Sequence, residues 1–233
     1  MAASGHGERA AGAFYGRRRG KTLRASQARL VETLLPRLRI DIARAPPGDL
    51  GTLFAGPVRA VHLEIGIGGG ERLIHAAAAA PDIGHIGVEP FVNGLAKALA
   101  GIAASGIANV RLFDEDATRL LDWLPGASLA RVELLYPDPW PKRRHWKRRF
   151  VNRANLDRIV RVLRPGGQFR FASDIDGYVN WTLRHALAHP DLEWTAMRPA
   201  DWREPWPGWV RTRYETKAIA AGRRPTYLTF MRR

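Results

Sequence analysis

Residues 134–150, LLYPDPWPKRRHWKRRF, join an acidic residue to a dense cationic and aromatic segment. An apolar run ends at Pro137-Asp138-Pro139, and six Lys or Arg residues follow in the eight positions 142–149. An apolar run closed by a breaker is typical of a buried strand, so we expect Asp138 just past its carboxyl end, where open α/β sheets bind ligands. The pattern predicts a site that grips a polyanion and presents a carboxylate to one unit of it. The alternative is a capped strand followed by a solvated charged loop.

A glycine-rich turn, Gly66, Gly68 and Gly70, lies between a predicted strand and a predicted helix. Glycine lets the backbone turn sharply and approach a ligand closely, which suits a nucleotide-like cofactor. A dinucleotide-binding turn needs Gly or Ala three places after its second glycine, and Glu71 stands there instead, where an acid opposes a pyrophosphate. S-Adenosylmethionine, which carries a sulfonium and an ammonium but no phosphate, is therefore favoured over NAD.

Three further acids lie at the ends of successive predicted strands: Glu64 ends the first, Glu89 ends the second and Asp116 follows the third. An acid that binds the ribose hydroxyls is expected about 20 residues after the glycine turn, and Glu89 has close to this spacing. Asp116 is placed to accept from the adenine amine, and Glu64 to hold the cationic amino-acid end of the cofactor. The alternative for each acid is a helix cap or a surface position.

The chain carries 37 Lys and Arg against 22 Asp and Glu, a net charge of +15. This excess predicts a polyanionic partner, nucleic acid before membrane. The absence of Cys excludes disulfides, thiolate catalysis and Cys-based metal sites and fits a reducing cytosol, so we expect a cytoplasmic protein without a metal. No apolar run approaches the ~18 residues of a membrane span, and the first residues do not resemble a signal peptide.

The hydrophobic pattern alternates between strands and helices, which predicts an α/β fold with a doubly wound, mostly parallel sheet. Strands are expected at 61–65, 85–89, 109–113, 129–136 and 168–172, helices at 71–80, 91–104, 117–124, 152–163 and 178–188, and an antiparallel edge pair at 192–197 and 225–231. We expect the main domain at 51–233, after a disordered tail at 1–14 and a basic arm with a helix at 15–50. That helix, over 26–39, is expected to be capped by Ser26 and ended or kinked by Pro36.

At these residues the chain resembles the bacterial tRNA (guanine-N7-)-methyltransferases, the TrmB family. The matching segments run in family order and are EIGIGGG at 64–70, VEP at 88–90, DA at 116–117, YPDPWPKRRHWKRR at 136–149, LRPGG at 163–167, SDIDGY at 173–178 and TRYE at 212–215. The PDPWPK segment with its basic tail is highly specific, whereas the glycine turn and LRPGG occur in many methyltransferases. The basic arm YGRRRGK also resembles the family's N-terminal segment.

The resemblance implies a Rossmann-like class I S-adenosylmethionine-dependent fold that methylates N7 of a guanosine in tRNA, at variable-loop position 46. It implies cofactor binding by Glu64, Gly66, Gly68, Gly70, Glu89, Asp116 and Asp138, with Asp138 also catalytic. It implies substrate contacts by Lys142, Asp174, Thr212, Arg213, Tyr214 and Glu215, and RNA contacts by Arg144, His145, Trp146, Lys147, Arg148 and Arg149. The family's usual Thr-Lys-Phe-Glu is Thr-Arg-Tyr-Glu here, and an Arg fork is not a Lys point charge.

Guanine N7 has an in-plane lone pair and needs no deprotonation, so the enzyme's task is mostly alignment. We expect Asp138 and Asp174 to hold the donor-bearing edge of the base, the neighbouring cations to grip phosphates, and Trp140 or Trp146 to offer a stacking face. The tryptophan-rich segment 202–209 is expected to pack over the sheet edge, with a base-stacking lid as the alternative. Methylation of an exocyclic amine and a non-catalytic RNA-binding role stay open as functions, and monomer or homodimer as assembly.

Overall fold

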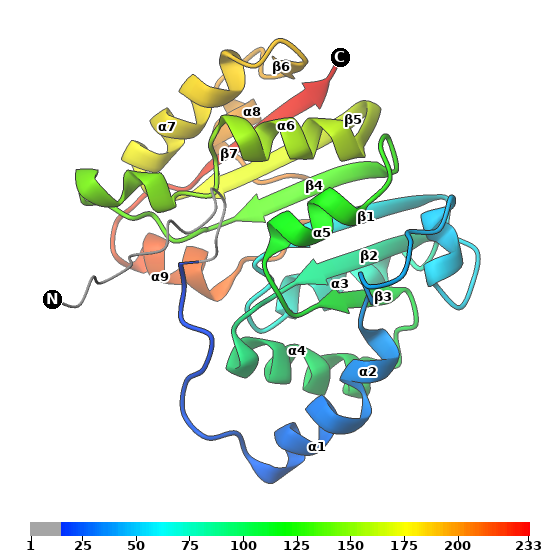
Figure 1. Cartoon of the computed structure of the whole chain (residues 1–233). Helices are drawn as coiled ribbons and strands as arrows, with labels where there is room; N and C mark the ends of the chain where they lie inside the picture. Colours follow the sequence, from blue (N-terminus) through cyan, green and yellow to red (C-terminus); the bar gives the residue numbers. More distant parts are fainter. Residues whose placement is uncertain (1–14) are drawn as a thin grey trace, which may run out of the picture.

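The fold is built on a seven-stranded sheet with the order β3-β2-β1-β4-β5-β7-β6. It is seen in a computed structural model that describes residues 15–233, so the tail predicted at 1–14 lies outside the described residues. The strands are β1 (Ala60–Ile65), β2 (Ile83–Val88), β3 (Val110–Phe113), β4 (Leu129–Leu135), β5 (Leu163–Ser173), β6 (Leu192–Trp194) and β7 (Thr226–Arg232). The first five pair in parallel, and β7 runs antiparallel to both β5 and β6. The predicted doubly wound sheet with an antiparallel edge is therefore confirmed (Figure 1).

Helices cover both faces of this sheet (Figure 1). One layer contains α5 (Ala117–Trp123), α6 (Arg153–Val162) and α7 (Asp176–Leu187), and the other contains α3 (Glu71–Ala79) and α4 (Val92–Ser105). The remaining helices are α1 (Ala25–Thr33), α2 (Leu35–Leu38), α8 (Ala200–Arg203), α9 (Arg213–Ala220) and the 3-10 helices η1 (Leu50–Leu53) and η2 (Arg143–Arg148). Helix α1 packs beside α4. Within the described part of the chain, no helix has the length and apolar character needed to cross a membrane.

The alternation of side chains along β1 places its acid on the opposite face from its core residues. Val61, Leu63 and Ile65 point into the large core that also contains α5 and α6. The residues between them, His62 and Glu64, point the other way because successive side chains of a strand face opposite sides. Strand β1 also lies where the chain order reverses, between β2 and β4. A crevice at the carboxyl ends of the strands is expected at such a switch point.

The observed elements follow the predicted ones except at a few ends. Arg24, and not Ser26, is the N-cap residue of the first helix. Pro36 stands in the first turn of the short α2, so the predicted helix is broken in two, as its proline suggested. Strand β5 begins at Leu163, five residues before the predicted start at 168, and its pairing with β4 shifts register in this added part. Helices α8, α9 and η2 were not predicted, because short helices leave little periodic signal.

Candidate functional site

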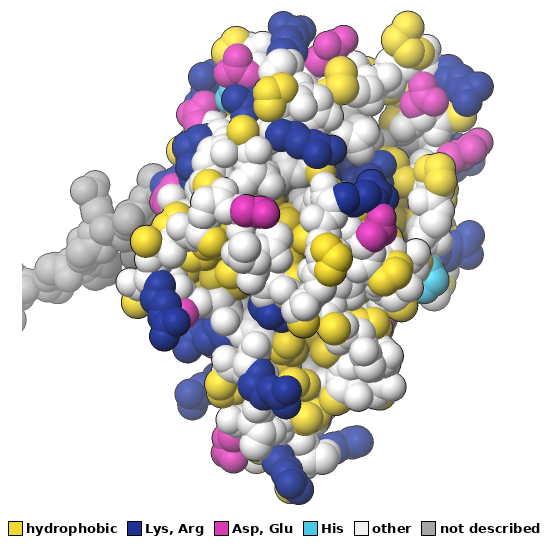
Figure 2. Space-filling model, turned by 90° about the vertical axis from the view of Figure 1, so that its right-hand side faces the viewer, with side chains coloured by type: hydrophobic (Ala, Val, Ile, Leu, Met, Phe, Trp, Pro, Cys, Tyr) yellow, Lys and Arg dark blue, Asp and Glu magenta, His cyan; other side chains and the backbone are white. Residues whose placement is uncertain are grey.

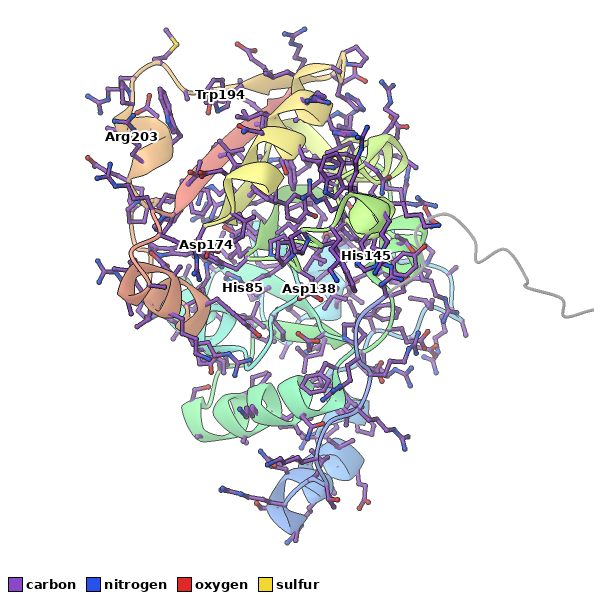
Figure 3. The ribbon with its side chains drawn as sticks, turned by 90° about the vertical axis from the view of Figure 1, so that its left-hand side faces the viewer. His85, Asp138, His145, Asp174, Trp194 and Arg203 are labelled. Atoms are coloured by element: carbon purple, nitrogen blue, oxygen red, sulfur yellow. The ribbon has the colours of Figure 1, made fainter. Side chains whose placement is uncertain are left out.

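A cavity of about 400 Å³ opens at the carboxyl ends of β1, β2 and β4. Its size is that of a small-molecule site. Its wall contains the four acids that the sequence singled out, Glu64, Glu89, Asp116 and Asp138, together with the glycine turn and the first residues of α9. Residues from strands far apart in the sequence therefore meet around one cavity, as expected for acids at the ends of parallel strands. Figure 3 looks onto this end of the molecule and shows Asp138 between Asp174 and His145.

The glycine turn has the backbone conformation that requires glycine. Gly66, Gly68 and Gly70 have φ angles of 81°, 56° and 77°, in the left-handed region that disfavours side chains. The Glu89 carboxylate fixes the turn by accepting hydrogen bonds from the backbone N–H of Gly68 (2.6 Å) and of Phe91 (2.9 Å). Burial raises the pKa of Glu89 above its ordinary value. Its two oxygens keep further lone pairs for a ligand hydroxyl.

Glu64 is buried in an ion-paired network that the sequence did not reveal. Arg72, on α3, donates to Glu64 at 2.9 Å and to Glu133 of β4 at 2.7 Å. Burial raises the pKa of Glu64 to about 6, although the charge of Arg72 opposes this shift. A glutamate inside the apolar run of β4 was the one sequence signal that a buried cation had to lie nearby.

Asp116 caps helix α5 and also faces the cavity. Its side chain accepts hydrogen bonds from the backbone N–H and the hydroxyl of Thr118, both at 2.9 Å. We expected Asp116 to be either a cofactor-binding residue or a helix cap. Its position allows both, because the capping side chain also lines the cavity. A cap held this way keeps the carboxylate oriented without a ligand.

The loop carrying Asp138 has unusual backbone at both ends. Tyr136 and Trp140 have φ angles of 48° and 44°, a region that costs a residue with a side chain about 1–2 kcal/mol. Strained backbone of this kind persists where the surroundings enforce it, commonly at functional sites. The Asp138 carboxyl opens onto the cavity, and the surrounding protein removes water from it and raises its pKa.

Arg149 is not placed as the predicted RNA contact requires. Its exposed fraction is 3%, and its guanidinium donates to the carbonyl oxygens of Pro139 and Gly177, each at 3.0 Å. Three aromatic rings, Trp146, Tyr178 and Trp181, lie within 4.9–5.2 Å of its guanidinium carbon. Arg149 therefore ties the Asp138 loop to the start of α7 and presents no charge to the surface. The same packing places the Trp146 ring beside Trp181 and against the Arg149 guanidinium.

The rest of the basic run forms helix η2, whose charges face outward. Arg143, Arg144 and Lys147 are exposed, and so is the preceding Lys142, which lies outside the cavity wall. Arg148 lies over the rings of Trp140 (4.8 Å) and Tyr15 (5.6 Å), and His145 packs edge-on against Trp140. This surface adjoins the cavity, whereas at the other end of the molecule the basic side chains are scattered among acidic and apolar ones (Figure 2).

The basic arm reaches the cavity from the other side. Tyr15, Gly16 and Arg17 line it. The arm is fastened to the start of α4, where Asn93 accepts from the Gly20 N–H at 2.7 Å and donates to the Lys21 carbonyl at 2.6 Å. The described part of the arm thus spans from α4 to η2, through the contact of Tyr15 with Arg148.

The predicted substrate segment 212–215 begins helix α9. Thr212, Arg213 and Tyr214 line the cavity, and Thr212 forms a capping box with Glu215. Glu215 is buried and accepts from the Trp209 indole (2.7 Å) and the Tyr227 hydroxyl (2.5 Å), so its position supports the segment from beneath.

Asp174 lies outside the cavity wall and is paired with Arg223 at 2.6 Å. Asp174 directly precedes Ile175, which is the N-cap residue of α7.

The tryptophan-rich segment packs over the sheet, as predicted. Trp206 and Trp209 contact Tyr227 of β7, and their rings lie 5.0 Å and 4.9 Å from the guanidinium carbons of Arg170 and Arg72. Cation–π contacts of this kind let aromatic rings cover a face that carries arginine side chains. Among residues 15–233, no group of three or more His, Asp or Glu side chains could hold a metal ion.

The cavity lining suits a nucleoside with a cationic tail better than a dinucleotide. Glu71, in the first turn of α3, places an acid where a pyrophosphate would need the helix N-terminus. With Glu71, five carboxyl groups line the cavity, and they favour ligand hydroxyls, amines and cations. Gly66 leaves open space where a side chain would stand, so a ligand can approach the turn.

Comparison with known proteins agrees with this chemistry. A family model described as a putative methyltransferase matches residues 58–228. The tRNA (guanine-N(7)-)-methyltransferase of Chelativorans sp. (strain BNC1) is 59% identical over 227 residues, covering 97% of this chain and 98% of that protein. The protein of the same name from Brucella anthropi is 58% identical over 233 residues, covering 100% of both.

Solved structures with low identity share the fold. A precorrin-6y C5,15-methyltransferase from Geobacter metallireducens has a TM-score of 0.51 at 14% identity, over 77% of this chain and 84% of that one. The 16S rRNA methyltransferase KamB has a TM-score of 0.51 at 18% identity, over 75% of this chain and 88% of that one. These likenesses confirm the predicted Rossmann-like class I methyltransferase fold.

Proposed function

The chain belongs to the tRNA (guanine-N(7)-)-methyltransferase family, and we propose that it transfers a methyl group from S-adenosylmethionine to N7 of a guanosine in tRNA. The observation that carries this conclusion is 59% identity to a protein of that name over 97% of the chain. The acid-lined cavity beside an exposed basic helix supports it independently. We also propose a cytoplasmic location, because the substrate is found there.

The residues around the cavity fit the cofactor. When bound, S-adenosylmethionine supplies an electrophilic methyl group on a sulfonium. We propose that Glu89 accepts from the ribose hydroxyls and Asp116 from the adenine amine, while the glycine turn gives close backbone approach. Glu64 pairs with the ammonium, since its buried carboxylate is held at the cavity wall by Arg72.

Asp138 then has the task of orienting the guanine. Its carboxylate accepts hydrogen bonds from the N–H groups of the guanine Watson–Crick edge, which directs N7 toward the methyl group. The strained loop and the Arg149 ties support a fixed position for this side chain. Well-aligned reactants can lower a barrier by about 7–11 kcal/mol, so alignment alone can account for much of the catalysis. At the start of α9, Thr212, Arg213 and Tyr214 line the same cavity, and we propose that they contact the same base.

The tRNA backbone is proposed to lie across η2 and the basic arm. Arg143, Arg144 and Lys147 are exposed beside the cavity, and Arg18 and Arg19 are exposed on the arm. Contacts of these side chains with phosphates hold the tRNA by its shape and charge and leave base recognition to the cavity.

Methyl transfer to unmodified tRNA, followed by mapping of the nucleotide, tests the function. We expect a labelled methyl group at one guanosine and chain cleavage there by aniline after borohydride treatment, because N7-methylation makes the base labile. Label that resists this cleavage would indicate methylation of an exocyclic amine. No transfer, with tRNA still bound, would indicate a non-catalytic RNA-binding protein.

A further inference from the structure

Arg72 holds Glu64 at the cavity wall, and its own side chain also faces the cavity, where no ligand contact has yet been proposed for it. It is the second residue of α3 and directly follows the glycine turn, and its side chain lines the same cavity as Glu64. Only 13% of the Arg72 side chain is exposed, and 7% of the Glu64 side chain. A buried ion pair is costly to form unless its remaining donors and acceptors find partners, so a pair in a cavity wall suggests a ligand that completes it.

The geometry fixes the guanidinium and leaves donors available. Glu64 and Glu133 each accept one hydrogen bond from it, at 2.9 Å and 2.7 Å, and the Trp209 ring covers it at 4.9 Å. A guanidinium has five N–H donors in a rigid fork. Among the described residues, the two carboxylates are its hydrogen-bond partners, so part of the fork can serve a ligand in the cavity.

We propose that Arg72 binds the carboxylate of the amino-acid end of S-adenosylmethionine, while Glu64 binds the ammonium of the same end. The inference rests on the proposed function. The amino-acid end carries a negative carboxylate and a positive ammonium. The adjacent cation of Arg72 and anion of Glu64 match these two charges and are already in place without the ligand. Glu133 is buried and accepts a hydrogen bond from Nη2 of Arg72. This bond holds the guanidinium in place while its other N–H groups donate to the ligand.

Arg213 is the rival for this carboxylate. It also lines the cavity, and one of its terminal nitrogens would lie 3.9 Å from a side-chain carbon added to Gly68. Arg213 is exposed and lies over the glycine turn, whereas Arg72 is mostly buried beside Glu64, the proposed partner of the ammonium. The two positions make different predictions for the same ligands, which allows a direct test.

The test is calorimetric binding of S-adenosylhomocysteine and of its decarboxylated analogue to wild-type protein, Arg72→Lys and Arg213→Gln. Wild type should bind the complete ligand about 10- to 100-fold more tightly than the analogue, the range for hydrogen bonds to a charged group. Arg72→Lys keeps the charge but loses the fork, and should reduce this ratio to a few-fold while binding of the analogue stays close to wild type. Arg213→Gln should leave the ratio unchanged.

Each other outcome counts against a specific statement. A wild-type ratio near one, equal weakening of both ligands by Arg72→Lys, or a ratio lost in Arg213→Gln overturns the role of Arg72. If Arg72→Lys does not fold, the wild-type and Arg213→Gln ratios still decide between the two arginines. Failure of wild-type protein to bind S-adenosylhomocysteine would instead refute the proposed cofactor.

Discussion

Replacing Arg149 with Met separates a structural from an RNA-binding role for this residue. Met fills the space of the aliphatic stem but removes the charge and both hydrogen bonds to the carbonyls of Pro139 and Gly177. Each hydrogen bond from a charged donor contributes about 1.5–3 kcal/mol, and each cation–π contact about 0.5–2 kcal/mol. Contacts of the Met sulfur with the same rings replace part of this loss. Removal of the guanidinium also removes the cost of desolvating its charge, which is seen in the lowered pKa of Arg149, so the net fall expected in the free energy of unfolding is about 2–4 kcal/mol.

The assay is urea unfolding together with tRNA affinity at several salt concentrations. We expect Arg149→Met to leave the slope of log affinity against log salt unchanged and to lower the turnover, because the Asp138 loop loses its anchor. Arg144→Met is the matched control, since Arg144 is exposed in the same segment. The control should keep its stability within about 0.5 kcal/mol and lose about one unit of salt slope. The reverse pattern, with the slope reduced in Arg149→Met and stability kept, would refute the reasoning.

Three further changes test other parts of the site. If Arg144 and Lys147 of η2 contact tRNA phosphates, the double variant Arg144→Ala/Lys147→Ala should lower the slope of log affinity against log salt by about two units, measured by filter binding. An unchanged slope would place the tRNA elsewhere. Because the pKa of Glu64 is raised to about 6, binding of S-adenosylhomocysteine should tighten as pH rises from about 5 to 7, as the carboxyl ionises to meet the ammonium, and this dependence should flatten in Glu64→Gln. Glu215→Gln should lower the free energy of unfolding by about 1–3 kcal/mol, because the amide has one acceptor oxygen and cannot accept from both the Trp209 indole and the Tyr227 hydroxyl. Tyr227→Phe, which removes one of these two donors, should cost less.

The sheet was predictable because its information is local. The parallel strands contain short, mainly apolar runs with a Gly, Pro or acidic residue close behind them, and periodicity and breakers are enough to identify these runs. Ligands bind at the carboxyl ends of such strands, and this rule is enough to place Glu64, Glu89, Asp116 and Asp138 around one cavity.

What sequence could not supply are the partners of charged side chains. The run at 142–149 contains residues of one chemical type, yet Arg144 is exposed and Arg149 is 3% exposed. The difference depends on Tyr178 and Trp181, about thirty residues away in the chain, which enclose Arg149. Local composition predicts a cationic surface but does not indicate which member of the run packs inward.

The same limit applies to the ion pairs around the cavity. The pairing of Arg72 with Glu64 and Glu133 joins α3 to β1 and β4, and Asp174 meets Arg223 from the other end of the chain. Such contacts depend on which strands are neighbours in the sheet. The sequence pattern predicted the class of fold but not the order of its strands. A charged residue in an apolar strand, as Glu133 is, predicts a buried partner without identifying it.

The most direct test of the account is the single-turnover rate of methyl transfer by Asp138→Asn at saturating S-adenosylmethionine and tRNA. Asparagine has nearly the same shape, but one oxygen that accepts from guanine becomes a donor, so the base loses its alignment. We expect the rate to fall by about 100-fold or more. A rate close to that of the wild type would contradict the central claim that this carboxylate orients the guanine for transfer.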